Sequence, residues 1–287
     1  MTGPILVTGA TGNVGGGAAR SLLAAGLPVR VAGTNVEGLR ERFPGAETVR
    51  LDFFDAQTFD AAVAGTSGLF LVRPPAISRV GPTLNALLDA AARRSRVHVV
   101  FVSVAGADTN RIVPHHRVEK HLRACGLPWT ILRPGFFAQN LADAYADDIR
   151  TEDRIYLPAG HGKVAFVDTR DIGAATAVIF AAPDAHRSAA YTLTGPEAVD
   201  FDTVAGLLTG TLGRTISYQP ATIAGYLRHL RRQRLPIAQC LVQTVLHTGL
   251  RRGQAERVDP ALARLLGRAP RTLAQYVSDH RKSWPPR

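Results

Sequence analysis

The sequence predicts an α/β fold in which helices cover both faces of a doubly wound parallel sheet. Over the first half of the 287 residues, short runs rich in β-branched residues alternate with helical stretches. Each run is almost entirely apolar, as expected for strands that are buried on both faces. A glycine-rich turn, GATGNVG over residues 9–15, follows the first run directly.

The elements of this first half follow in order. A helix after the first strand carries Val14, Ala18 and Leu22 at helical spacing and ends at Gly26. Leu84, Leu87, Leu88 and Ala91 mark a helix before the fifth strand, and a later helix covers residues 115–124. The expected strands are residues 5–8, 29–32, 48–51, 69–72, 97–102 and 129–132.

Composition narrows the class of protein. Hydrophobic residues make up 46% and charged residues 20%, which is ordinary for a globular chain. The longest apolar runs are too short to span a bilayer, and no basic leader precedes the first strand. Cys125 and Cys240 are too few for a disulfide framework or a cysteine metal cluster. We expect a cytoplasmic protein without a membrane or metal site.

The net charge of +11 is carried by one part of the chain. Residues 1–223 have 21 Lys and Arg against 20 Asp and Glu, whereas residues 224–287 have 13 against 3. A basic surface of this kind suits nucleic acid, an acidic partner or an anionic substrate. It also suits a solvated arginine-rich helix face. The sequence has no zinc-finger or basic-zipper pattern, so we expect no nucleic-acid partner.

The glycine turn has the spacing Gly9-x-x-Gly12-x-x-Gly15, between an apolar strand and an amphipathic helix. This context is typical of a Rossmann-type dinucleotide site. The first glycine permits the tight turn, the second lets backbone amides approach the pyrophosphate, and the third allows close packing of helix and strand. The helix N-terminus adds positive potential. The sequence therefore predicts binding of NAD or NADP.

The pattern changes after Pro134-Gly135. Residues 164–167 and 191–193 still suggest strands, and residues 171–180 a helix. We expect a Rossmann core over residues 1–157. Residues 158–287 would supply the remaining core strands and a smaller, mainly helical portion that covers a substrate, without forming an independent domain. Its expected helices are residues 201–212, 222–233, 236–248, 258–266 and 272–282.

Four motifs resemble the NmrA-like branch of the atypical short-chain dehydrogenases. They are VTGATGNVG at 7–15, EKHL at 119–122 with LPWTILRPG at 127–135, PAGHGKVAFVD at 158–168 and YTLTGPE at 191–197. The resemblance is greatest to the subgroup of ergot-alkaloid dehydrogenases and NAD(P)H:quinone reductases. It covers about residues 4–220 and leaves out the arginine-rich end.

The resemblance implies a set of cofactor contacts at the ends of successive strands. Asp52 is open to a second interpretation, since it could simply end its strand. The implied contacts are Thr11, Gly12, Asn13 and Val14 at the pyrophosphate, Asp52 and Phe53 at the adenine, Val72, Arg73 and Pro74 along the ribose and nicotinamide, and Ser103, Pro134, Gly135 and Phe136 around the nicotinamide. Gly9 belongs to the same cofactor site through the tight turn.

The loop after the second strand bears on the choice between NADP and NAD. Most NAD enzymes place an acid there to bind the ribose 2′-hydroxyl. Here Thr34 and Asn35 follow Gly33, so no acid would repel a 2′-phosphate. Relatives that prefer NADP often have arginine at the position of Thr34, and this chain departs from that pattern too. We expect NADP to be preferred, with Arg40 or Arg42 within reach of its phosphate or simply solvated.

The catalytic residues depart from those of ordinary short-chain dehydrogenases, which use Ser, Tyr and Lys. By resemblance, Arg111 and His115 occupy the places of the tyrosine and lysine. His115 or His116 could donate the proton, beside Ser103, since imidazole titrates near neutrality. Alternatively, one histidine packs at the helix start and the other faces solvent.

The substrate is expected next to the nicotinamide. Phe136, Phe137 and Asn140 follow the sixth strand, where a ligand cleft opens in such folds, although both aromatic residues also suit a core. The expected activity is NAD(P)H-dependent reduction of an iminium, enone or quinone group of a small aromatic or heterocyclic metabolite, in secondary metabolism. The alternatives are a non-catalytic NAD(P)-sensing regulator and a redox-neutral cyclase or epimerase. A homodimer is compatible with each.

Overall fold

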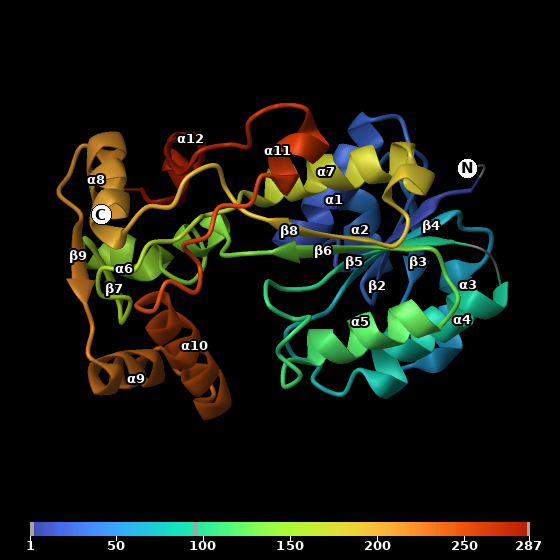
Figure 1. Ribbon diagram of the computed structural model, residues 1–287, viewed down its shortest axis with the longest axis horizontal. Helices are drawn as coiled ribbons and strands as arrows, with labels where there is room; N and C mark the ends of the chain where they lie inside the picture. Colours follow the sequence, from blue (N-terminus) through green and yellow to red (C-terminus); the bar gives the residue numbers. More distant parts are fainter. Residues whose placement is uncertain (1–2, 95–96, 286–287) are drawn as a thin grey trace. The chain divides into compact units, whose positions relative to one another are not determined.

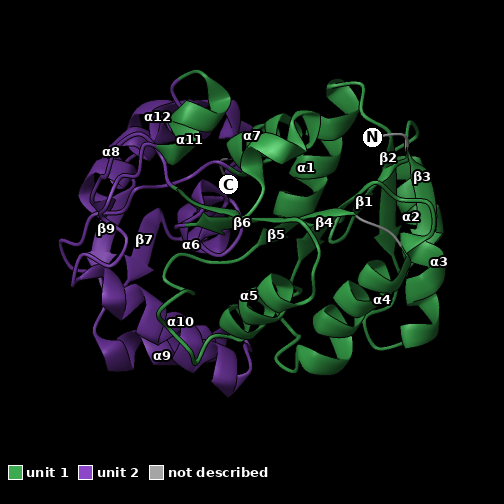
Figure 2. Ribbon diagram, turned by 45° about the vertical axis from the view of Figure 1, so that its right-hand side comes forward, with its two compact units in different colours: residues 1–134, 169–193, 261–268 green, residues 135–168, 194–260, 269–287 purple. Residues whose placement is uncertain are grey.

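The computed structural model of the chain describes residues 3–94 and 97–285 (Figure 1). It comprises two compact units (Figure 2). Unit 1 contains residues 1–134, 169–193 and 261–268, and unit 2 contains residues 135–168, 194–260 and 269–287. The chain thus returns to unit 1 twice, because late elements pack against its early ones. The expected boundary after residue 157 does not coincide with this division.

Unit 1 is built on a seven-stranded sheet in which every neighbouring pair is parallel. The strand order is β3-β2-β1-β4-β5-β6-β8, so the direction of winding reverses between β1 and β4. This confirms the predicted Rossmann-type fold. The strands are β1 (Ile5–Val7), β2 (Val29–Gly33), β3 (Glu47–Arg50), β4 (Gly68–Val72), β5 (His98–Val102), β6 (Trp129–Pro134) and β8 (Ala189–Leu193).

Helices cover both faces of this sheet (Figure 1). One face carries α1 (Asn13–Ala24), α7 (Thr169–Ala181) and α11 (Ala261–Leu266). The other carries α3 (Phe59–Val63), α4 (Ala86–Arg94) and α5 (Pro114–Ala124). The central strands β4 and β5 are therefore almost fully buried, which explains their unbroken apolar sequences. The short helix α2 (Val36–Arg42) follows β2.

Unit 2 has its own apolar core around Phe201, Tyr145 and Trp284. Side chains of Asp200, Thr222 and Thr272 accept hydrogen bonds from the first turns of three helices and mark where these begin. The unit contains α6 (Ala146–Thr151), α8 (Phe201–Leu212), α9 (Ile223–Arg232), α10 (Ile237–Leu250), α12 (Leu273–Asp279) and a parallel pair of strands, β7 (Arg154–Leu157) and β9 (Ser217–Pro220).

The predicted strand at residues 164–167 is wrong. Val164 forms an isolated antiparallel bridge with Val199, and Val167 forms an isolated parallel bridge with Phe137. The segment is apolar because it lies in the core of unit 2, so burial alone produced the strand-like pattern. Short 3₁₀ turns occupy Ala56–Thr58, Ala138–Leu141, Pro183–His186 and Arg281–Ser283, and a π-helical turn occupies Gly81–Asn85.

Within the part of the chain that the structure describes, no helix is long and apolar enough to cross a membrane.

Candidate functional site

The glycine turn joins β1 to α1 at the carboxyl edge of the sheet. Gly9 has a φ of +66°, a conformation that residues with a side chain rarely adopt. A Cβ atom on Gly15 would lie 2.3 Å from the carbonyl oxygen of Gly9. Helix α1 can therefore approach the turn only because residue 15 has no side chain. A Cβ atom on Gly12 would make ordinary contact, 3.5 Å from the same oxygen.

The N-terminus of α1 is open to an anion. Gly12 is the N-cap residue, and no side chain caps the helix. The first turn of a helix leaves backbone N–H groups without intrahelical partners and carries positive potential. It also stands beside the reversal between β1 and β4, where ligands bind in folds of this kind. These features fit the pyrophosphate of a dinucleotide.

Helix α2, which follows β2, places one of the two candidate arginines at the glycine turn. A guanidinium N–H of Arg42 donates to the carbonyl oxygen of Thr11 at 2.9 Å. Arg40 instead forms an exposed ion pair with Glu37 at 2.7 Å. Asn35 caps α2 by accepting a hydrogen bond from the backbone N–H of Gly38. Arg42 is thus the better candidate for a 2′-phosphate.

The segment after β3 forms a tight turn. The carboxylate of Asp52 accepts a hydrogen bond from the backbone N–H of Phe54 at 2.9 Å. Phe53 is partly buried against the core of unit 1, while Phe54 is 79% exposed. Asp52 therefore shapes this turn, and its contact with adenine stays a prediction.

Arg73 organises the segment after β4. Its guanidinium donates to the backbone carbonyl oxygens of Pro74 and Ile77, at 3.0 and 2.5 Å. Its Nε donates to Nε2 of His115 at 3.2 Å. After the neighbouring strand β1, the hydroxyl of Thr8 accepts from the backbone N–H of Val72 at 2.9 Å and joins the ends of β1 and β4. Arg73 thus holds this loop to the start of α5.

His115 is buried and accepts a hydrogen bond from a cation. Burial and the charge of Arg73 lower the pKa of His115 from 6.5 to about 4. The ring is consequently neutral at pH 7, with the lone pair of Nε2 directed at Arg73. This geometry argues against the expected role of His115 as a proton donor. His116 is half-buried, and its Nδ1 donates to the carbonyl oxygen of Ala107 at 2.7 Å.

Ser103 is engaged by a buried carboxylate. Its hydroxyl donates to Glu119 at 2.6 Å, and both side chains are buried. Arg133 and Arg123 also donate to Glu119, at 2.7 and 2.9 Å. Burial alone would raise the pKa of Glu119, but hydrogen bonds from Arg133, Ser103 and Arg123 hold it below its ordinary value. The Ser103 proton is therefore committed to Glu119.

Sequence reasoning missed this cluster of Ser103, Glu119, Arg123 and Arg133. A signal was available, because Glu119 lies at helical spacing with His115, Val118 and Leu122 on the buried face of α5. An acid on such a face requires cationic partners. The sequence does not reveal which arginines these are, since Arg133 comes from β6.

The remaining predicted residues divide between the units. Pro134 ends β6 in unit 1, whereas Gly135, Phe136, Phe137 and Asn140 belong to unit 2. Phe136 packs edge-to-face on Phe166 and His247, with ring centres 5.5 and 5.9 Å apart. Asn140 lies in the 3₁₀ turn Ala138–Leu141. Their contacts with cofactor or substrate stay predictions.

Comparison with known proteins assigns this chain to a family. Residues 1–276 match the model of the NmrA-like family. The chain is 31% identical over 282 residues to an NAD(P)H azoreductase of Xenophilus azovorans, covering 96% of this chain and 97% of the relative. It is 29% identical over 294 residues to an agroclavine dehydrogenase of Claviceps fusiformis, covering 98% of each.

A solved structure agrees with the fold. The NADPH-dependent quinone oxidoreductase of Escherichia coli, complexed with NADPH, superposes with a TM-score of 0.86 at 25% identity, covering 96% of this chain and 99% of the other. These findings confirm the resemblance inferred from the four motifs, and with it the predicted class, an NAD(P)H-dependent oxidoreductase. The chain belongs to the NmrA-like family.

Proposed function

We propose that this protein reduces an activated acceptor, namely the carbon of an iminium, enone or quinone group in a small aromatic or heterocyclic metabolite. The observation that carries the proposal is the engagement of His115 and Ser103, two of the three residues expected in proton transfer. His115 is neutral and accepts from Arg73, and Ser103 donates to Glu119. Such a site suits acceptors that are electrophilic without protonation by the protein.

When bound, NADPH would supply a hydride from C4 of its nicotinamide. An iminium carbon that takes this hydride becomes an amine and needs no proton, whereas a quinone or enone takes one proton from water. The chain's part is to bind and orient. Gly12 and the first turn of α1 would hold the pyrophosphate, and Arg42 would favour a 2′-phosphate. His115 keeps Arg73 and the loop after β4 in place.

Two of the relatives support this substrate class by their names. One is named an NAD(P)H azoreductase and the other an NADPH-dependent quinone oxidoreductase. Azo and quinone groups are both conjugated acceptors. Phe136, Phe137 and Asn140 are our candidates for contact with the substrate. A role in secondary metabolism stays a prediction.

A panel of acceptors tests the proposal through oxidation of NADPH, followed by absorbance. N-methyl-3,4-dihydroisoquinolinium, 1,4-naphthoquinone and cyclohexenone should include substrates, and cyclohexanone, which needs protonation, should not be reduced. Turnover of the iminium should show no acidic limb near pH 6.5, because hydride addition to an iminium carbon consumes no proton. The Gly12→Val variant is the control for cofactor binding.

Two outcomes would refute the proposal. Tight NADPH binding without turnover of any acceptor would favour the non-catalytic regulator. Reduction of cyclohexanone with an acidic limb in the pH profile near 6.5 would show that a protonated histidine takes part.

A further inference from the structure

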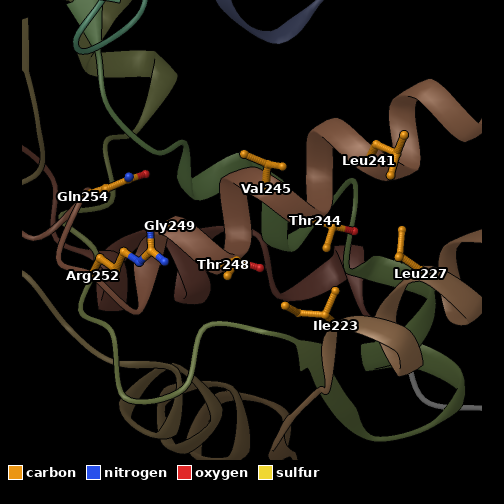
Figure 3. A pocket seen from close by; sticks show the side chains of 9 residues that line it. All are labelled: Ile223, Leu227, Leu241, Thr244, Val245, Thr248, Gly249, Arg252 and Gln254. Atoms are coloured by element: carbon orange, nitrogen blue, oxygen red, sulfur yellow. The ribbon is translucent and has the colours of Figure 1, made fainter.

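A pocket of about 380 Å³ lies between α9 and α10 in unit 2 (Figure 3). Its apolar wall consists of Ile223 and Leu227 from α9, and Leu241 and Val245 from α10. Thr248 and Arg252 line it near the end of α10 and just beyond. Its volume falls within the range of small-molecule sites, roughly 300–1,000 Å³. The cofactor machinery described above uses none of these residues.

The two helices are fixed by a buried polar network on their other faces. The hydroxyl of Tyr145 donates to Nε2 of His247 on α10, whose Nδ1 donates to the carbonyl oxygen of Gln243. On α9, Nε2 of His229 meets the carboxylate of Asp148 at 3.0 Å. The ring of Tyr226 packs against that of His247 at 5.4 Å. The pocket between α9 and α10 is thus preformed and does not need to be opened by a ligand.

The face of α10 beside the pocket is apolar and exposed. Ile237, Leu241 and Val245 recur every four residues and are 65%, 52% and 71% exposed. Surface apolar residues are common singly, but a contiguous group of them usually marks a binding site. An apolar group bound here would remove these side chains from water.

The polar end of the pocket favours an anion. Arg252 is exposed, and within residues 3–94 and 97–285 it forms no ion pair. No acidic residue lines the pocket. The hydroxyl oxygen of Thr248 is buried and has no hydrogen-bond partner within those residues, which is costly. An oxygen of a bound anion would satisfy both groups, and the charge of +10 on residues 224–287 adds long-range attraction.

We propose that this pocket binds a small organic anion with an apolar body, such as a carboxylate on an alkyl-substituted ring. The body lies among Ile223, Leu227, Leu241 and Val245, and the anionic group meets Arg252 and the hydroxyl of Thr248. A pocket of this volume, with Arg252 outside any ion pair of the described residues, suits a small anion better than the apolar surface of another protein. The site does not depend on the proposed reduction, since all its residues belong to unit 2.

Calorimetry on the full chain without cofactor tests the proposal. The probes are 4-butylbenzoate and its neutral counterpart 4-butylbenzyl alcohol. The benzoate should bind one site per chain about tenfold more tightly than the alcohol, a difference of about 1.4 kcal/mol. Arg252→Gln should abolish that difference. Arg232→Gln removes the same charge from the end of α9, outside the pocket, and should preserve it.

Val245→Asp supplies a second test, because residue 245 is exposed and its replacement should not prevent folding. A carboxylate there should weaken both probes, with an unchanged circular dichroism spectrum. Equal benzoate affinity in the wild type and Arg252→Gln would overturn the proposal, as would equal losses in Arg252→Gln and Arg232→Gln. A dimer that Val245→Asp dissociates, with no probe bound by the wild type, would show instead that this face joins two copies of the chain.

Discussion

Glu119 shows at the residue scale how the edge of the sheet is held together. A buried carboxylate is costly unless it is paired and hydrogen-bonded. Glu119 is fully buried and accepts from Ser103 just after β5, Arg133 on β6 and Arg123 on its own helix. Three elements therefore meet at one side chain, and removing its charge should affect all of them.

We predict that Glu119→Gln destabilises the protein by about 1–3 kcal/mol, because buried donors lose their charged acceptor and Arg133 keeps only its ion pair with the exposed Asp108. Urea unfolding measures the loss. Glu41→Gln is the control, since Glu41 is exposed and its replacement should change stability by less than about 0.5 kcal/mol. Equal midpoints for the two variants would mean that the cluster contributes nothing to the fold.

Arg42 makes a prediction about cofactor choice. Its guanidinium lies at the glycine turn, and Arg40 is neutralised by Glu37. Arg42→Gln should weaken NADPH binding about tenfold, roughly 1.4 kcal/mol, and leave NADH binding nearly unchanged. Arg40→Gln should leave both affinities unchanged. Equal losses for NADPH and NADH in Arg42→Gln would assign this arginine to the turn itself rather than to the 2′-phosphate.

At the scale of elements, the strand–turn–helix unit of β1 and α1 contains two glycines with different roles, Gly12 and Gly15. Gly15 gives space for packing, while in the proposed cofactor site Gly12 would give space for the pyrophosphate. Gly15→Ala should destabilise the protein by about 1–3 kcal/mol or more, because its Cβ would overlap the carbonyl of Gly9. Gly12→Ala should fold normally and lose NADPH affinity by about tenfold or more.

Thermal unfolding and calorimetry together distinguish these two losses. Gly206→Ala on α8 is the control, because its Cβ would meet open space and alanine favours a helix by roughly 0.5–1 kcal/mol. A Gly12→Ala variant with normal stability and normal NADPH affinity would remove the turn from the cofactor site.

The elements also show how far the sequence alone could lead. All six early strands and the glycine turn were predictable, because local apolar patterns and turn chemistry determine them. The segment at residues 164–167 was not, since an apolar run has the same sequence pattern in a strand and in an irregular buried segment. The contacts of Ser103 and Arg73 were also out of reach, because they join residues far apart in the chain.

At the scale of the whole molecule, buried neutral histidines in both units make the stability of the fold depend on pH. Burial lowers the pKa of His98, His115 and His247 from 6.5 to about 4. Nearby positive charges add to the shift at His98 and His115. Between these two values an unfolded chain binds protons that the folded chain does not.

The contribution of these histidines to the free energy of unfolding should therefore be fully present above pH 6.5. It should fall as the pH drops from 6.5 toward 4. Each histidine can contribute up to about 3 kcal/mol to this loss, at 1.36 kcal/mol per pKa unit. Urea midpoints at pH 7.5 and pH 5 measure the effect. His115→Gln should lose less between the two pH values than the wild type. Stability that rises on acidification would contradict the neutral, buried state of these rings.

The central claim is hydride transfer from the cofactor to a carbon of the acceptor, and isotope transfer tests it most directly. NADPH carrying deuterium at both C4 positions is incubated with the protein and N-methyl-3,4-dihydroisoquinolinium, and the product is analysed by mass spectrometry and NMR. The account predicts one deuterium at C1 of the product for each NADPH oxidised. A product without deuterium, or labelled cofactor that stays intact across the whole acceptor panel, would contradict it.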